Sequence, residues 1–361
     1  MSVVLLGVKE TAPGERRVAL TPETAKKLTA LGVSVRFEPG AGQAAGFTDA
    51  AYEAAGATLM DDTRWAEIDV LLCVQAPDTA RLARLPAGAS VVGLLQPATD
   101  APLAALGTVP GLQLFPLQQL PRTTRAQSMD VLSSQAGMAG YKATLIAAMR
   151  SPRFFPMLTT AAGTVRPAKV LVVGAGVAGL QAIATARRLG AQVEGFDVRP
   201  ETREQIQSLG ARFLDLGVSA AGEGGYARAL SEDERALQQQ RLGDHLRGVD
   251  VVICTAAVPG RRAPVILAAG MVEGMLPGSV IVDLAAESGG NCALTVPGEC
   301  IDHGGVLIDG PVNLASLGAT QASEMYARNL FNFVALFVRD GQLAFDWDDE
   351  LLAKTRWSAA E

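Results

Sequence analysis

The sequence has few of the side chains that usually build metal sites and acid–base centres. It contains two histidines in 361 residues, His245 and His303, and they are not placed as a pair of ligands. A histidine-built metal site is therefore not expected. The four cysteines show no C-x-x-C spacing, which is typical of structural cysteines in a reduced, cytosolic protein. They are Cys73, Cys254, Cys292 and Cys300.

Two other absences narrow the function. The net charge is −6, so the basic surface of a nucleic-acid-binding protein is missing. Every apolar stretch meets proline, glutamine or a charge before it is long enough to span a bilayer. Residues 1–10 have no basic region ahead of their short apolar run, which predicts a first strand and not a signal peptide. A function at a membrane would therefore require docking through another chain.

The chain does contain a nucleotide-binding pattern. Residues 170–173, V-L-V-V, form an apolar run of the kind that is buried in parallel sheets. Gly174, Gly176 and Gly179 follow with G-x-G-x-x-G spacing. The first glycine permits a tight turn, the second lets a pyrophosphate approach, and the third lets the next helix pack on the strand. The N–H groups and the dipole at the start of that helix favour the phosphate charge.

An acid stands where the ribose of a dinucleotide is recognised. The next strand, residues 192–196, ends at Asp197, and an acid there binds the ribose 2′-hydroxyl of NAD and repels the 2′-phosphate of NADP. Arg199 could tolerate that phosphate, but we interpret it as a solvated side chain. NAD(H) is therefore expected, and a glycine turn without a ligand is the alternative. The expected contacts are Gly174, Gly176, Val177, Ala178, Gly179, Asp197, Val198 and Arg199.

Alternating strand and helix patterns predict two α/β domains. In the first, Thr21-Pro22-Glu23 opens a helix, and no glycine fingerprint is present. Strands are expected at residues 3–8, 33–37, 69–74 and 90–95, and in the second domain at 170–173, 192–196, 249–254 and 279–284. A helix over 134–150 joins the domains, and one over 316–339 returns to the first. We predict two doubly wound, Rossmann-like domains with a cleft between them, formed by residues 1–133 plus 313–361 and by residues 134–312.

A second polar stretch lies just before the joining helix. Residues 122–134 read R-T-T-R-A-Q-S-M-D-V-L-S-S, which places arginine, glutamine and aspartate beside the expected cleft. A polar linker, with Ser133 and Ser134 as helix caps, is the alternative interpretation.

With these residues in place, the chain resembles the NAD(H)-binding soluble component of proton-translocating nicotinamide nucleotide transhydrogenase, over nearly its whole length. The most discriminating mark is R-A-Q-S-M-D at 125–130. The other marks are E-R-R-V-A-L-T-P at 15–22, the glycine turn and its helix at 174–187, D-L-A at 283–285 with G-G-N-C at 289–292, and N-L-F-N-F at 329–333.

Alanine dehydrogenase is a sister family with a similar N-terminal motif. Its catalytic lysine and histidine correspond here to Gln75 and Gln96, and an amide cannot act as a general acid or base near neutral pH. Arg17, which would hold a substrate carboxylate in that family, is retained, and we interpret it as structural. Hydride transfer between two nicotinamides moves no proton at the reacting carbons, so it needs no such group.

The resemblance implies roles for particular residues. NADH would bind this chain, and hydride would pass directly to NADP⁺ on a partner subunit. Arg122, Asp130 and Ser133 would hold the nicotinamide end, and Gln127 would reach toward the NADP(H). Residues 217–233 resemble a loop that closes over bound nucleotide, with Tyr226 at its tip. Further contacts are expected from Ala256, Ala257 and Val258 on the adenosine or ribose side, and from Asn291 on the nicotinamide side.

The resemblance also implies an assembly. A membrane-spanning subunit would couple the transfer to proton translocation, and this chain, a homodimer, would be cytoplasmic and attached to the inner membrane through its partners. Because the chain ends without a membrane segment, we expect the membrane part to be encoded separately. Two alternatives remain. A free-standing amino- or imino-acid dehydrogenase would turn over without a partner, and a non-catalytic NAD(H)-binding subunit would bind without turnover.

Overall fold

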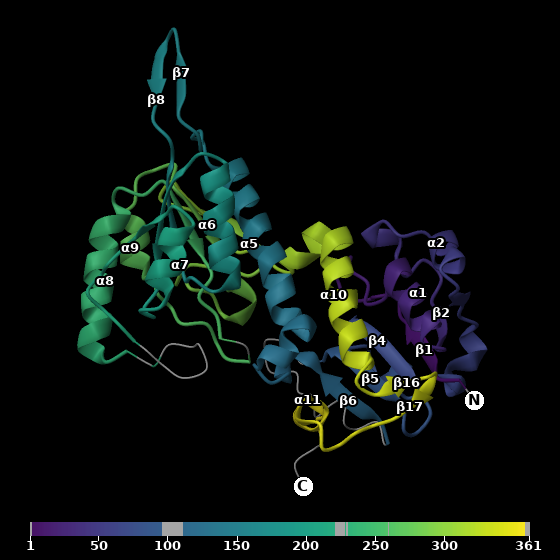
Figure 1. The fold of residues 1–361 in the computed structure, drawn as a ribbon. Helices are drawn as coiled ribbons and strands as arrows, with labels where there is room; N and C mark the ends of the chain where they lie inside the picture. The colour runs from purple at the N-terminus through teal and green to yellow at the C-terminus, as the bar shows by residue number, and fades with distance from the viewer. Residues whose placement is uncertain (1, 96–110, 221–227, 229, 259, 358–361) are drawn as a thin grey trace. The chain divides into compact units, whose positions relative to one another are not determined.

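The computed structural model describes residues 2–95, 111–220, 228, 230–258 and 260–357 of the chain. Gln96 and Tyr226, both considered above, lie outside the described residues. The chain divides into two compact units, one of Met1–Gln135 with Ala315–Glu361 and the other of Ala136–Leu314. Figure 1 draws the first in purple, blue and yellow and the second mostly in teal and green. Among helices in the described ranges, none combines the length and apolarity that a membrane crossing requires.

The first unit is built on a six-stranded parallel sheet. The strands are β1 (Val4–Gly7), β2 (Ser34–Phe37), β3 (Thr58–Leu59), β4 (Val70–Gln75), β5 (Ser90–Leu94) and β6 (Gln113–Pro116). Their order, β3-β2-β1-β4-β5-β6, is the doubly wound order, in which β1 pairs with both β2 and β4. Leu5 lies beside Val35 on one side and Val70 on the other. The predicted strands of this half are thus confirmed.

Helices cover both faces of this sheet. α1 (Pro22–Ala30) begins as predicted, because Thr21 caps it and exchanges hydrogen bonds with Thr24. The other elements are α2 (Asp49–Ala54), α3 (Thr79–Leu82), α10 (Ala319–Val334) and α11 (Glu350–Thr355), with the 3₁₀ turns η1 (Gln43–Ala45), η2 (Asp62–Glu67), η3 (Leu117–Gln119), η4 (Thr124–Met129) and η6 (Leu314–Gly318).

The C-terminal segment returns to the first unit, as predicted. Helix α10 contacts η4, α1 and η1, and it buries Tyr326, Leu330 and Phe333 in the core. The Tyr326 hydroxyl donates to the Cys73 carbonyl at 2.9 Å and accepts from the Leu94 N–H at 3.1 Å, so it ties α10 to the ends of β4 and β5.

One boundary of the C-terminal helix was predicted wrongly. The helix ends at Val334, and β16 (Val338–Arg339) and β17 (Gln342–Leu343) follow as an antiparallel hairpin. Asp340 and Gly341 both have positive φ, at 48° and 68°, which is the conformation that a two-residue Asp-Gly hairpin turn requires. The turn chemistry of this dipeptide therefore outweighs the apolar pattern that predicted a helix through residue 339.

The second unit contains a seven-stranded sheet in the order β11-β10-β9-β12-β13-β15-β14. Its strands are β9 (Lys169–Val173), β10 (Gln192–Phe196), β11 (Arg212–Phe213), β12 (Val251–Cys254), β13 (Val280–Asp283), β14 (Cys300–His303) and β15 (Val306–Asp309), with only β14 antiparallel. Its helices are α6 (Val177–Arg188), α7 (Thr202–Ser208), α8 (Glu232–Leu246), α9 (Ala269–Glu273) and the turn η5 (Ala286–Ser288). α5 (Val131–Arg150) starts in the first unit and continues into the second.

A small hairpin projects from the second unit. It consists of β7 (Leu158–Thr160) and β8 (Gly163–Val165), and every residue of both strands is exposed (Figure 1). No expectation from the sequence placed strands here, because six residues of strand carry too short a pattern. The segment instead separates the joining helix α5 from β9, the first strand of the nucleotide-binding pattern.

Candidate functional site

The three glycines of the second unit each meet a different steric demand. Gly174 has φ +94°, and a Cβ there would stand 2.8 Å from Thr255 Oγ1. A Cβ on Gly179 would lie 1.9 Å from the Gly174 carbonyl oxygen, so this glycine lets α6 pack onto the turn. At Gly176, by contrast, no atom lies within 4 Å of the Cβ position. The space in front of Gly176 is therefore open, as the approach of a pyrophosphate requires.

Helix α6 presents the N–H groups of its first turn at this open space. Gly176 is its N-cap residue and offers no side chain to that turn. The first intrahelical bond is made by Leu180, which donates to the Gly176 carbonyl at 2.8 Å. Val177 is 47% exposed, and Ala178 is half-buried. An anion of the size of a phosphate suits this end of a twelve-residue helix, because the N–H groups and the helix dipole both face it. The residues present thus fit the dinucleotide that the sequence predicted.

Asp197 lies beside the glycine turn and is fixed there by hydrogen bonds. Its Oδ2 accepts from the Ala175 N–H at 2.7 Å and from Arg199 at 2.8 Å, and its Oδ1 accepts from the Arg199 N–H at 2.9 Å. Burial opposes ionisation, but these donors more than offset it and lower the pKa of Asp197 below its ordinary value. The expectation that Arg199 is solvated is wrong, because its side chain is 18% exposed and paired with Asp197. Val198, between them, packs against the apolar core.

The turn after β12 is held by side chains from neighbouring strands. Asn291 is fully buried, and its amide accepts from the Ala256 N–H at 2.9 Å and donates to the Ala256 carbonyl at 2.7 Å. Asp283 in turn accepts from the Asn291 N–H at 2.7 Å. Ala256 and Val258 are half-buried and Ala257 is exposed, so the turn itself reaches the surface.

Sequence reasoning missed Thr255, although it follows the end of a buried strand. Its hydroxyl donates to the Gly174 carbonyl at 2.9 Å, and Asn291 holds the next residue, Ala256. The carboxyl ends of β9, β10, β12 and β13 are therefore connected through Gly174, Asp197, Thr255 and Asn291. Ligands of open α/β sheets bind at such carboxyl ends.

The polar stretch of the first unit folds into the six-residue 3₁₀ helix η4 and the start of α5. Asp130 caps α5: its Oδ1 accepts from the Ser133 N–H at 2.9 Å, and its Oδ2 accepts from the Ser133 hydroxyl at 2.5 Å. The helix cap is thus Asp130, not Ser133 or Ser134. Arg122 and Gln127 are exposed on the same segment. The structure therefore joins Asp130 to Ser133, and places Arg122 and Gln127 at the surface nearby in the sequence.

Arg17 belongs to a buried network in the first unit. Its guanidinium donates to Glu15 at 2.9 Å and 2.7 Å and to Gln135 Oε1 at 2.9 Å. Arg17 is 4% exposed and the Glu15 side chain is fully buried. Burial opposes ionisation of Glu15, but Arg17 overcomes it and lowers the pKa of Glu15 to about 2. Gln75 Nε2 donates to the other side of this carboxylate, to Oε2 at 3.1 Å.

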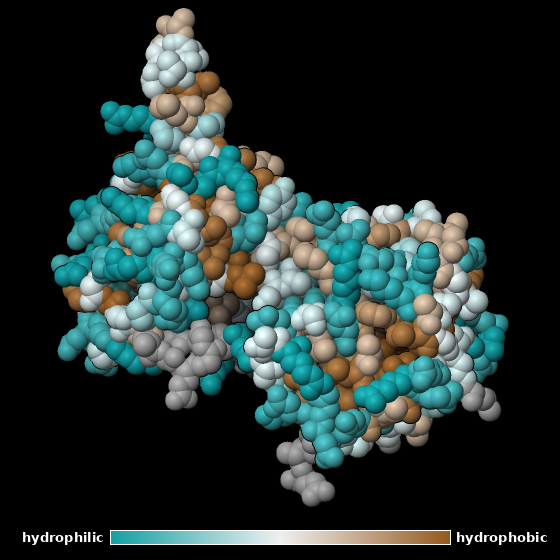
Figure 2. Space-filling view, in the orientation of Figure 1, coloured by the Kyte–Doolittle hydropathy of each residue, from teal (hydrophilic) through white to brown (hydrophobic). Residues whose placement is uncertain are grey.

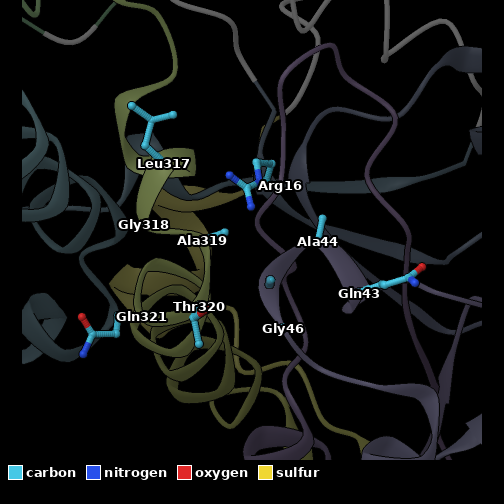
Figure 3. Close-up of a pocket in the computed structure, with 10 residues that line it drawn as sticks. Arg16, Gln43, Ala44, Gly46, Leu317, Gly318, Ala319, Thr320 and Gln321 are labelled. Atoms are coloured by element: carbon cyan, nitrogen blue, oxygen red, sulfur yellow. The ribbon is translucent and has the colours of Figure 1, made fainter. Parts of the chain in front are cut away.

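An open hollow of the first unit lies elsewhere. Its walls are Arg16, η1 with Gly46, and residues 317–321 at the start of α10. Figure 3 shows Arg16 and Ala44 across from the first residues of that helix. None of the residues predicted for nucleotide binding or hydride transfer lines it.

Comparison with known proteins places the chain in a family. Residues 7–139 match the family described as Alanine dehydrogenase/PNT, N-terminal domain, and residues 143–359 match Alanine dehydrogenase/PNT, C-terminal domain. The first portion of the NAD(P) transhydrogenase alpha subunit of Rhodospirillum rubrum, a separate chain, is 44% identical over 360 residues, which cover 96% of this chain and 94% of that protein. Alanine dehydrogenase of Mycobacterium tuberculosis is 31% identical over 78% of this chain and 72% of that protein.

A solved structure supports the same placement. The crystal structure of transhydrogenase from Sinorhizobium meliloti has a TM-score of 0.89 to this chain at 42% identity, covering 98% of this chain and 97% of that one. Both sheets, the returning C-terminal segment and nearly the whole sequence are thus shared. The chain belongs to the alanine dehydrogenase/PNT family, and within that family it is a homologue of the transhydrogenase alpha subunit, an enzyme component.

Proposed function

We propose that this chain binds NAD(H) and passes hydride directly between NADH and NADP⁺ held by a partner subunit of a proton-translocating transhydrogenase. The observation that carries the proposal is the closed state of Arg17. In an amino-acid dehydrogenase, this arginine would bind the substrate carboxylate, but here its guanidinium is buried against Glu15 and Gln135. A substrate carboxylate would have to displace an internal one.

The absence of a lysine beside Arg17 supports the same choice. Gln75 occupies the position of the dehydrogenase lysine, and its amide is bonded to Glu15. An amide neither takes up nor releases a proton near neutral pH, whereas amino-acid oxidation requires proton transfer. Hydride transfer between two nicotinamides requires positioning and exclusion of water instead. A free-standing dehydrogenase is therefore the weaker candidate.

We assign the dinucleotide to the glycine turn of the second unit. The pyrophosphate would lie on the first turn of α6, against Gly176, Val177 and Ala178, and the ribose hydroxyls on Asp197. Val198 and the turn Ala256–Val258 would border the adenosine side. Asn291, with its amide bonded to Ala256, would act from behind that turn and shape the path toward the nicotinamide. The bound nicotinamide supplies the hydride.

The segment from Arg122 to Ser133 would orient the nicotinamide end. Arg122 is a donor for the carboxamide or ribose, and the Asp130–Ser133 pair offers a fixed carboxylate and hydroxyl. Gln127 is exposed, and its side chain makes no hydrogen bond within the part of the chain that the structure describes. It would therefore be available to reach the NADP(H) of the partner subunit.

The assembly follows from the same proposal. The Rhodospirillum rubrum relative is one portion of an alpha subunit, which implies further subunits, including one that spans the membrane and moves protons. This chain would then be cytoplasmic and held at the inner membrane by its partners. We further propose a homodimer that covers the β7–β8 hairpin. Apolar side chains at and beside this hairpin are exposed, and the hydropathy colouring shows them on the projecting arm (Figure 2). They are Phe154, Met157, Leu158 and Val165.

Stopped-flow kinetics tests the function. NADH is mixed with the chain and an NADP⁺ analogue, with and without a heterologous NADP(H)-binding subunit. We expect transfer only when that subunit is present. Oxidation of NADH with pyruvate and ammonia, and no transfer to a competent partner subunit, would assign the chain to the amino-acid dehydrogenases instead. Tight binding of NADH without turnover under any pairing would leave a non-catalytic nucleotide-binding subunit.

A further inference from the structure

We propose that Asn329 and Asn332 are positioning residues for interprotein hydride transfer, because together they clamp the Ser128 carbonyl and so fix the segment that carries Gln127. The proposal deepens the transhydrogenase function proposed above and rests on it. It also gives a purpose to the N-L-F-N-F stretch, which the nucleotide site does not use.

Two side chains of α10 converge on one backbone atom of η4. The Asn329 Nδ2 donates to the Ser128 carbonyl oxygen at 2.8 Å, and the Asn332 Nδ2 donates to the same oxygen at 2.9 Å. Residues three apart lie on one face of a helix, so α10 presents both amides to η4 at once. A carbonyl oxygen has two lone pairs, and this clamp occupies both.

The 3₁₀ helix η4 needs such external support. It has six residues, whereas 3₁₀ helices longer than three or four residues are uncommon because their hydrogen bonds are poorly aligned. Thr123, its N-cap residue, makes no side-chain cap hydrogen bond. The last carbonyls of a helix have no partner inside it, and Ser128 supplies one of these. The asparagines therefore satisfy a group that η4 cannot satisfy itself.

A second tether holds the other end of the same segment. Arg125 pairs with Asp349, the N-cap residue of α11. Gln127 lies between Arg125 and Ser128 in the sequence, and its own side chain is exposed. The backbone on either side of Gln127 is thus held by the C-terminal segment, while the side chain stays available. Misplacement of a reacting group by about 1 Å can slow a reaction by roughly 100-fold, so this support matters for transfer.

The two asparagines differ in how cleanly they can be tested. Asn329 is 9% exposed, and its Oδ1 has no hydrogen-bond partner among the described residues, so its removal would also leave a gap in the core. Asn332 is half-buried at the edge of α10, where a shorter side chain costs little packing. Asn332 is therefore the primary site for substitution.

The experiment compares substitutions that keep or remove the donor. Asn332→Ala and Asn332→Asp both remove the N–H donor, and the second preserves shape, whereas Asn332→Gln retains a donor. Gln321→Ala, at an exposed position of the same helix, is the matched control. Each full-length variant is assayed with the heterologous NADP(H)-binding subunit for hydride-transfer rate, and alone for NADH affinity and for trypsin cleavage after Arg125.

We expect Asn332→Ala and Asn332→Asp to slow hydride transfer by about tenfold, the effect of one net hydrogen bond on a rate. Their NADH dissociation constants should match the unaltered chain, and cleavage after Arg125 should quicken. Asn332→Gln should recover most of the rate, and Gln321→Ala should lose none.

Unaltered transfer rates in both donor-removing variants would overturn the clamp and leave the transhydrogenase function standing. Parallel losses of NADH affinity and of rate would also overturn it, since they would indicate general destabilisation. Absence of transfer by the unaltered chain with a competent partner subunit would overturn the function itself, and the clamp with it.

Discussion

Asp197 accepts a hydrogen bond from the backbone N–H of Ala175, at 2.7 Å and across 22 residues of sequence. The acid at the end of β10 is therefore fastened to the turn between Gly174 and Gly176. A dinucleotide would meet its ribose acceptor and its phosphate donors as a single preformed unit, whose parts do not have to be ordered on binding.

Asp197→Asn removes the charge and keeps the shape. We expect the dissociation constant of NADH to rise about tenfold, because a charge-assisted hydrogen bond to the ribose becomes a neutral one. We also expect the preference for NADH over NADPH to shrink, since the repulsion of a 2′-phosphate disappears and Arg199 loses its carboxylate partner. Fluorescence titration with both nucleotides measures this. Asp215→Asn, which breaks an exposed pair with Arg203, is the control, and an unchanged NADH:NADPH ratio in Asp197→Asn would contradict the assignment.

Gly176→Ala tests the phosphate seat directly. The position has open space for a Cβ and a φ of −77°, so the variant should fold with the thermal stability of the unaltered chain. Its methyl group would occupy the space of the pyrophosphate, and NADH binding should weaken by at least about 100-fold, as expected for a steric clash of a few kcal/mol. Gly270→Ala, where the Cβ is equally unobstructed, is the matched control. Normal NADH affinity in Gly176→Ala would remove the pyrophosphate from this turn.

Gln127→Asn shortens an exposed side chain of η4 that makes no hydrogen bond among the described residues. We expect interprotein hydride transfer to slow by roughly tenfold to 100-fold, because the amide no longer reaches the second nucleotide. NADH affinity should stay nearly unchanged. Stopped-flow transfer and equilibrium titration separate the two effects. A loss of NADH affinity would instead place Gln127 in the binary site.

Glu10 should make the stability of the first unit depend on pH. Its buried carboxyl group accepts from the Val74 N–H at 2.6 Å and the Gln75 N–H at 3.1 Å, and burial raises its pKa from 4.5 to about 7. Because the pKa in the folded state lies above that in the unfolded state, the stabilisation is complete below about pH 4.5 and is lost as the pH rises through about 7.

The free energy of unfolding should therefore fall by up to about 3 kcal/mol from this group between acidic and mildly alkaline pH. Glu10→Gln should flatten that part of the dependence, as measured by urea unfolding at several pH values. Glu53→Gln, on the exposed side of α2, should leave the slope as it is. An identical slope in Glu10→Gln and the unaltered chain would refute the assignment.

The sequence predicted best where local chemistry decides the structure. The glycines at 174, 176 and 179 and the Thr21 cap depend on neighbours within a few residues, and both lie where they were expected. The apolar runs at 170–173 and 251–254 became buried parallel strands for the same reason. Each pattern contains its own explanation, either a turn that only glycine can make or a run that only a buried strand can use.

Long-range hydrogen bonds were beyond the reach of the sequence. Nothing local indicates that Asn291 would hold the Ala256 backbone, 35 residues away, or that Asn329 would reach Ser128 across 201 residues. The interpretation of Arg199 failed for a related reason, because its pairing with Asp197 depends on a bend that the two residues create together. Polar residues of a site are predictable as types, while their partners follow only from the fold.

The closure of Arg17 on Glu15 has a consequence for the economy of the cell. An arginine that already holds a carboxylate of its own chain is insulated from the free organic acids around it. Reducing equivalents bound nearby would then have no metabolite to leak into, however abundant that metabolite becomes. Selectivity for a single acceptor would thus arise from an internal occupant, present in every copy of the chain from the moment it folds.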